Sequence, residues 1–168
     1  SMLCTGASAQ QPAYAAAFVS QNVPALVGVG SDSNVSITMR NTGTRTWVQS
    51  EGDVFLATQQ PQDNYYWCIQ GNVYGSRSGN RVLLPHDVAP GDEVTFEFVV
   101  RPLGCKFSAP ATLRFRMLSQ TFGTFGEETP DPMIGVGSGA DYVSQQVPDT
   151  VPASATFQVT LTFKNTST

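Results

Sequence analysis

The feature that most constrains this chain is an internal repeat without gaps. The segment FVSQNVPALVGVGSDSNVSITMRNTGT at residues 18–44 aligns with YVSQQVPDTVPASATFQVTLTFKNTST at residues 142–168, at a constant offset of 124 positions. Of the 27 aligned pairs, 11 are identical. Self-similarity of this kind is typical of repeated structural units. We therefore expect one complete domain followed by the first two strands of a second copy.

The repeat also sets the predicted domain organisation. The complete domain spans residues 10–127, and residues 141–168 form the truncated second copy, because two strands alone cannot bury a core. We expect these strands to come from a longer tandem array. Residues 128–140 are the predicted linker, in which several residues should break any regular structure, namely Pro130, Pro132, Gly135, Gly137 and Gly139.

The N-terminus indicates export. Residues 1–9 read as an expression tag followed by the end of a signal peptide, with an A-x-A cleavage site at residues 7–9. The alternative is a flexible terminus of small residues. Export predicts a secreted, periplasmic or cell-surface location. In that oxidising environment the remaining cysteines, Cys68 and Cys105, are expected to form a disulfide.

Alternation of apolar and polar residues predicts several strands. Residues 35–40, 93–100 and 113–118 show a period of two, which places apolar side chains on one face. Shorter strands are expected at residues 14–20, 47–49, 54–58, 66–70, 81–84 and 121–125. Short strands separated by turn residues predict an all-β fold, an immunoglobulin-like antiparallel β-sandwich. The predicted core residues are Trp47, Phe96, Phe98 and Phe115.

Composition limits the partners of the chain. Only 13% of its residues are charged, and the net charge is −4. Basic residues do not cluster, which argues against a nucleic-acid partner. No apolar stretch approaches the roughly 20 residues that cross a bilayer, so no membrane span is expected.

Five short motifs stand in a fixed order. They are NTGTRTW at residues 41–47, PQDN at 61–64, RVLLP at 81–85, VAPG at 88–91 and FRM at 115–117. Together they resemble the four-tryptophan, immunoglobulin-like domain of the neighbour-of-breast-cancer-gene-one family, which also occurs in bacterial exported proteins. The resemblance covers residues 15–127, and the C-terminal segment resembles the start of a second such domain. It implies a binding module rather than an enzyme.

The chain departs from this family in three places. Trp47 and Trp67 match the first two tryptophans, but Phe115 stands at the third position and residues 122–125 replace the fourth. Residues 69–79 intervene where the family passes quickly to the RVLLP segment, and we interpret them as an inserted loop. Cys105 also stands where the family has no cysteine, which supports a local disulfide with Cys68. In the chain-entropy model its closure stabilises by about 3–4 kcal/mol.

An aromatic cluster is the best candidate for a ligand-binding surface. It consists of Tyr65, Tyr66, Trp67 and Tyr74. Tyrosine and tryptophan give contact area at low entropic cost, and they stack on sugar rings or peptide side chains. Because neighbours in an extended segment point in opposite directions, Trp67 alternatively packs in the core while the tyrosines reach solvent.

Neither a catalytic site nor a metal site is expected, and no cofactor is implied. His86 is the only histidine, and a Cys–His nucleophile would need a free, activated thiol, which the predicted disulfide removes. The cysteine and histidine spacing matches no zinc site. Oxygen donors such as Asp63 and Asn64 are interpreted as turn residues rather than calcium ligands.

The sequence therefore favours a non-catalytic, secreted recognition or adhesion module that binds a protein or a glycan through its inserted aromatic loop. The alternative is an architectural spacer domain in a tandem-repeat surface protein. Alternating apolar residues of the second copy also predict self-association by strand exchange. These residues are Phe157, Val159, Leu161 and Phe163.

Overall fold

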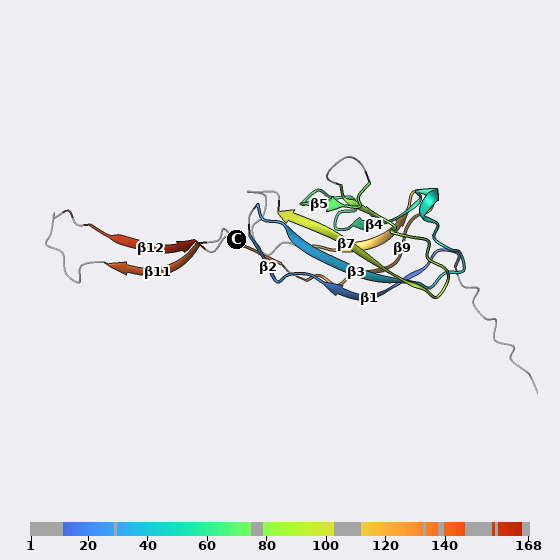
Figure 1. Cartoon of the computed structure of the whole chain (residues 1–168), viewed down its shortest axis with the longest axis horizontal. Coiled ribbons are helices and arrows are strands. Elements are labelled where there is room, and N and C mark those ends of the chain that lie inside the picture. The colour runs from blue at the N-terminus through green and yellow to red at the C-terminus, as the bar shows by residue number, and fades with distance from the viewer. Residues whose placement is uncertain are drawn as a thin grey trace, which may run out of the picture.

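The computed structural model describes residues 12–28, 30–74, 79–102, 112–132, 134–137, 140–146, 156 and 158–165. Two antiparallel four-stranded sheets form a sandwich, with strand orders β1-β3-β7-β5 and β6-β4-β8-β9 (Figure 1). Their bounds are β1 Ala16–Asn22, β3 Ser33–Asn41, β4 Val54–Thr58, β5 Trp67–Gly71, β6 Arg81–Leu83, β7 Glu93–Pro102, β8 Phe115–Ser119 and β9 Gly123–Glu128. The predicted immunoglobulin-like β-sandwich is confirmed.

The core lies between the two sheets and follows the predicted alternation. Every second residue of β3 and β7 is buried, beginning with Val35 and Val94. Both tryptophans are buried in this core, as are Phe96, Phe98 and Phe115. The apolar period of two therefore gives the inner face of each long strand.

Strand β4 is buried on both of its faces. All five of its residues are buried, although a strand of a two-layer sandwich usually exposes its outer face. Leu56 belongs to the core between the sheets, whereas Phe55, its neighbour in β4, lies outside that core and is still 0% exposed. Other residues must cover this part of the outer face.

A buried asparagine ties the end of β3 to two loops. The Asn41 amide nitrogen donates to the carbonyl of Arg45 at 2.9 Å and to that of Val88 at 3.0 Å, and its Oδ1 accepts from the Gly43 N–H at 3.0 Å. A Cβ at position 43 would lie 2.4 Å from the Ala13 carbonyl oxygen. The NTG turn therefore requires a residue without a side chain at Gly43.

The strand predicted at residues 47–49 does not form. Trp47 pairs with Val88 in an isolated bridge, with backbone hydrogen bonds of 3.0 and 2.9 Å. A 3-10 turn at Gln49–Glu51 follows and ends at Gly52, whose φ is 60°. The prediction was wrong here because the chain turns immediately after the buried Trp47.

The expectation that no regular structure forms in the linker is also wrong. β9 continues to Glu128, and Gly135–Gly137 forms a short strand, β10. β10 pairs in parallel with β2 (Leu26–Gly28), so that Val136 lies opposite Val27. Ile134, just before β10, is buried. The linker therefore starts as part of the first domain.

The C-terminal segment forms a hairpin of β11 (Ala140–Gln146) and β12 (Thr160–Asn165). Figure 1 shows it beyond the end of the sandwich. Each pair of facing residues in β1 and β3 recurs 124 positions later in β11 and β12. A shift in the pairing register is also repeated. It lies between Phe18 and Ser20 in one hairpin and between Tyr142 and Ser144 in the other.

Two sequence predictions lie outside the described residues in whole or in part. Residues 1–11 include the predicted signal-peptide remnant, and residues 103–111 include Cys105. Cys68 is the one cysteine among the described residues, so the Cys68–Cys105 disulfide stays a prediction. In the part of the chain that is described, no helix is long and apolar enough to cross a membrane.

Candidate functional site

The three tyrosines of the predicted binding surface reach solvent. Tyr65, Tyr66 and Tyr74 are between 43% and 65% exposed. The first two directly precede β5, and Tyr74 follows it. Exposed tyrosine rings offer a partner both apolar area and a hydroxyl that can form a hydrogen bond.

Trp67 does not belong to this surface. It is only 1% exposed, and its indole Nε1 donates a hydrogen bond of 2.9 Å to the carbonyl of Thr112. As the first residue of β5 it points between the sheets, where its ring packs in the core. This removes Trp67 from the candidate ligand-binding residues.

The segment after β5 leaves the first sheet and reaches the second. The Tyr74 N–H donates to the Arg81 carbonyl at 3.0 Å, and the Leu83 N–H donates to the Asn72 carbonyl at 2.8 Å. Residues 72–74 therefore lie along β6. The predicted loop at 69–79 is shorter than expected, since Ile69 to Gly71 belong to β5. Residues 75–78 lie outside the described residues.

Tyr74 and Arg81 cover the outer face of β4. The Tyr74 ring meets the Phe55 ring edge-on, with 5.2 Å between centroids and 76° between planes. The guanidinium carbon of Arg81 lies 5.8 Å from the Phe55 centroid, a cation–π arrangement. The segment after β5 thus explains part of the burial of Phe55, and it positions Tyr74 with one side packed and the rest in solvent.

Asp63 holds Arg81 in place through a bidentate ion pair. Arg81 Nε donates to Asp63 Oδ1 at 2.8 Å, and Nη2 donates to Oδ2 at 2.6 Å. These hydrogen bonds from Arg81 lower the pKa of Asp63 and, in return, raise the pKa of Arg81. The negative charges that Tyr74 and Tyr65 acquire when their phenols ionise also raise the pKa of Arg81.

The loop between β4 and β5 fixes Asp63. Asp63 adopts a left-handed φ of 58°, and its N–H donates to the Thr58 carbonyl at 2.9 Å. Asn64 Nδ2 donates to two loop carbonyls, those of Gln59 and Pro61, at 2.8 and 2.9 Å. Asn64 Oδ1 also accepts from the Tyr66 N–H at 3.2 Å. Turn-stabilising side chains therefore hold the acidic partner and the start of the tyrosine segment together.

Contacts with Phe55 and Asp63 thus bring Tyr74, Arg81 and Asp63 together, and the exposed Tyr65 follows Asp63 by two residues. We call Tyr65, Tyr74, Arg81 and Asp63 the tyrosine–arginine surface. It offers aromatic ring faces, phenol hydroxyls and a guanidinium of which two N–H groups serve Asp63. Such a set suits neutral ligands with stacking faces and many oxygen acceptors. Among the described residues, no group of three or more His, Cys, Asp or Glu could hold a metal ion.

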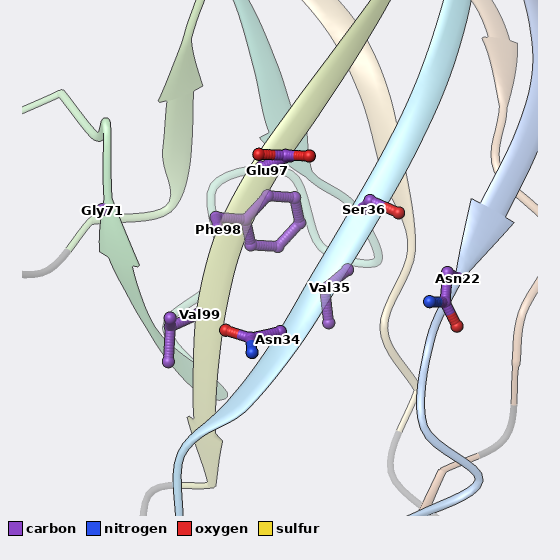
Figure 2. A pocket seen from close by; sticks show the side chains of 8 residues that line it. All are labelled: Asn22, Asn34, Val35, Ser36, Gly71, Glu97, Phe98 and Val99. Carbon is purple, nitrogen blue, oxygen red and sulfur yellow. The ribbon is translucent and has the colours of Figure 1, made fainter.

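A separate groove lies on the first sheet, away from the tyrosines. It has a volume of about 550 Å³ and crosses β1, β3, β7 and the end of β5. Figure 2 shows side chains on its rim from three of these strands, among them Asn22, Asn34, Ser36 and Glu97. Its lining mixes polar and apolar residues, and its one ring, Phe98, is buried.

Sequence reasoning missed a second aromatic cluster, at Tyr14. The Tyr14 ring lies 5.3 Å from both Phe122 and Phe125, and the Arg45 guanidinium carbon lies 5.5 Å from its centroid. Burial raises the pKa of Tyr14, and Arg45 opposes this. Phe122 remains two-thirds exposed. The aromatic residues at 122 and 125 were the available signal, but their partner lies more than 100 residues away in sequence.

Asp53 lies beside this cluster. Its carboxylate accepts hydrogen bonds from the hydroxyls of Ser119 and Thr121 at 2.6 and 2.9 Å and from the Thr121 N–H at 3.0 Å. Burial pushes the pKa of Asp53 upward, but these hydrogen bonds outweigh burial and lower it. The carboxylate is therefore satisfied by the protein itself, and it acts as a structural anchor between two loops.

Comparisons with known proteins assign no family to this chain. No protein-family model matches the chain, and no curated protein matches it. Solved structures similar to it include AvmM, which catalyses macrocyclization in alchivemycin A biosynthesis, at 13% identity over 74% of this chain and 90% of that chain, with a TM-score of 0.42. A β-glucosidase from Listeria innocua is 12% identical over 74% of this chain and 16% of that chain, with a TM-score of 0.32. Likenesses this distant carry no argument about function.

Proposed function

We propose that this chain is a non-catalytic recognition or adhesion module that binds an oligosaccharide or a protein loop through the tyrosine–arginine surface, with Tyr66 at its margin. The observation that carries the proposal is that the exposed Tyr74 and an arginine fixed by Asp63 pack on the same Phe55 ring. The exposed Tyr65 follows Asp63 by two residues. A rigid arginine flanked by exposed rings is an arrangement that favours stacking and directional hydrogen bonds.

The proposed setting is an exported protein, as the small-residue N-terminus and the low charge suggest. The resemblance to four-tryptophan domains agrees with a binding role. Here, however, both tryptophans are buried, so the proposed contact surface consists of tyrosines instead. Their exposed area can be covered by a partner at low entropic cost, because tyrosine has few rotatable bonds.

Binding to a glycan array, followed by titration calorimetry with any hit, tests the proposal. Tyr65→Ala should abolish or strongly weaken binding without changing stability, because Tyr65 is exposed. Tyr74→Ala should weaken binding and also cost stability, since its ring covers Phe55. Phe122→Ala is the matched control, because it removes an exposed ring from the other aromatic cluster. Equal loss of binding in the Tyr65 and Phe122 variants would contradict the proposed site.

The second candidate is an architectural spacer, which the β2–β10 pairing favours. That pairing fastens the start of the linker to the first domain, which would keep neighbouring units at a defined spacing. A spacer predicts that the parent protein binds neither the glycan array nor a set of extracellular matrix proteins. It also predicts that the tyrosine variants behave like the parent.

A further inference from the structure

We infer that Asn34 is an attachment site for an N-linked glycan, which covers part of the outer face of the first sheet. Residues 34–36 read Asn-Val-Ser, the N-x-S/T sequence at which exported proteins accept such a glycan. Export, on which this modification rests, belongs to the proposed function. What the tyrosine–arginine surface binds is a separate matter, because Tyr74 and Arg81 pack on the second sheet.

Asn34 and Ser36 lie on the outer side of β3. Val35, between them, is buried in the core, whereas Asn34 is exposed and Ser36 is partly exposed (Figure 2). Side chains alternate in this way along every strand. Asn34 is the second residue of β3, and β1 pairs with β3 only from Ser36 onward. A glycan on Asn34 therefore projects into solvent near the rim of the sheet.

The Asn34 side chain does not hold the fold together. Elsewhere in the sandwich the amide nitrogen of an asparagine donates to a backbone carbonyl, as in Asn41, Asn64, Asn72 and Asn80. Among the described residues, no hydrogen bond engages the Asn34 side chain. A glycan replaces one hydrogen of the amide nitrogen, so its attachment to Asn34 removes no contact of the domain.

The transfer takes place before the sandwich closes. In the folded domain the backbone at Asn34 is paired with β7, opposite Val99, and it cannot enter the site of a transferase. In the transfer, Asn34 Nδ2 bonds to the anomeric carbon of a lipid diphosphate-linked oligosaccharide and gives one proton to the enzyme. The bond from that carbon to the diphosphate oxygen breaks, and the lipid diphosphate leaves with the electron pair. The folded domain then only has to leave room for the product.

The groove on the first sheet provides this room. It has a volume of about 550 Å³, and Asn34 lies on its rim with Asn22, Ser36 and Glu97 (Figure 2). Amide, hydroxyl and carboxylate groups can exchange hydrogen bonds with sugar hydroxyls. The first sugar residues therefore meet a polar surface that can order them against the sheet.

The repeat shows that the strand itself does not require an asparagine here. Asn34 aligns with Gln158 in the second copy, and Ser36 aligns with Thr160. Gln158 is exposed, as Asn34 is. The second copy thus keeps an amide and a hydroxyl at these positions but lacks the acceptor. Asn34→Gln is accordingly a mild substitution for the fold.

Secretion of the full chain tests the inference. The chain is expressed behind a foreign signal peptide, in a cell whose secretory pathway contains an oligosaccharyltransferase. It carries Asn165→Gln, because residues 165–167 are the other N-x-S/T sequence of the chain. The secreted protein should carry a glycan that peptide N-glycosidase removes, and peptide mass spectrometry should then find aspartate in place of the modified asparagine. Asn34→Gln and Ser36→Ala should each abolish the modification, whereas Ser36→Thr should retain it.

Asn22→Gln is the matched control. Asn22 is an exposed asparagine on the same groove, but Val23 and Pro24 follow it, so it is not an acceptor. The foreign signal peptide delivers the chain independently of its own N-terminus, so a negative result refutes the site and leaves export open. Export is tested separately, by fractionation of the cells that make the protein naturally.

Three outcomes would overturn the inference. One is a secreted, folded chain of unmodified mass. Another is a glycan that Asn34→Gln leaves in place, which would put the attachment at a different residue. The third is full modification of the Ser36→Ala variant, since the hydroxyl residue would then play no part. Tryptophan fluorescence of each secreted variant checks that the sandwich is folded, because both tryptophans lie in its core.

Discussion

The two hairpins of this chain, β1–β3 and β11–β12, have the same backbone pairing in different surroundings. Residue pairs, and even the irregularity after Phe18 and Tyr142, coincide. Burial does not. Ile37 is buried against β7, whereas its counterpart Leu161 is about half exposed. The comparison indicates that the hairpin sequence itself specifies register, and that the rest of the sandwich decides which side chains leave water.

The largest expected difference between the hairpins is the effect of removing an apolar side chain. Ile37→Ala should lower the free energy of unfolding by about 2–5 kcal/mol, because it leaves a cavity in the core. Leu161→Ala should change it by less than about 0.5 kcal/mol. Urea unfolding followed by tryptophan fluorescence measures this, since both tryptophans lie in the sandwich. A comparable loss in the Leu161 variant would mean that the hairpin packs on the sandwich.

The turn after β3 offers a direct exchange between the copies. The second copy has Ser167 where the first has Gly43. Gly43→Ser should destabilise the sandwich by about 1–3 kcal/mol, because the new Cβ would meet the Ala13 carbonyl and displace the N-terminal segment. The same urea titration measures the loss. Thr44→Ser in the same turn is the control, and equal stability of both variants would show that residue 43 tolerates a side chain.

Acid should lower the stability of the sandwich through the Arg81–Asp63 ion pair, which the C-terminal hairpin does not contain. The folded pKa of Asp63 lies below its unfolded value of about 3.9, so the unfolded chain binds more protons as the pH falls. The contribution of the pair, about 1 kcal/mol, is therefore present above pH 4 and is lost below it.

Asp63→Asn should consequently lower stability at pH 7 and flatten its dependence on pH between 5 and 2. Fluorescence-monitored urea titrations across this range measure both effects. Asp32→Asn removes the acid of the exposed Arg101–Asp32 pair, and its effect should be smaller because solvent screens that pair. An unchanged acid profile in the Asp63 variant would show that the pair contributes nothing.

The smallest expected effect is the exchange at the charged position of β3. Arg40→Lys installs the residue that the second copy carries at Lys164, and it should change stability by less than about 0.5 kcal/mol. The Arg40–Glu93 pair is 40–51% exposed, and exposed pairs contribute little. A loss above 1 kcal/mol would instead show that this position depends on the two-pronged geometry of arginine.

Much of the sandwich could be predicted from local pattern. The alternation of Val35, Ile37 and Met39 predicts the inner face of β3. The repeat predicts that β11 and β12 pair. β2 and β10 could not be predicted, because each has three residues, one or two of them glycine, and their pairing joins segments more than 100 residues apart. β4 was predicted as a strand, but the cover over Phe55 depends on where the segment after β5 turns.

The candidate site was predictable only in part. The composition of residues 65–74 pointed to exposed tyrosines. The alternation left open whether Trp67 belongs to the binding surface or packs in the core. The link from Asp63 to Arg81 was not predictable, since it depends on a left-handed turn and on the course of the chain between β5 and β6. The Tyr14–Phe125 contact was missed for a similar reason, because it joins the segment before β1 in one sheet to β9 in the other.

The parallel pairing of β2 and β10 also bears on how this chain responds to mechanical load. β2 follows the first strand of the domain, and β10 precedes the hairpin, so a pull between the two ends of the chain acts on them in opposite directions along their common axis. Parallel strands loaded in this way are sheared, and their hydrogen bonds must break together rather than one after another. Three residue pairs thus place a shear clamp at the point where tension from the C-terminal side enters the sandwich.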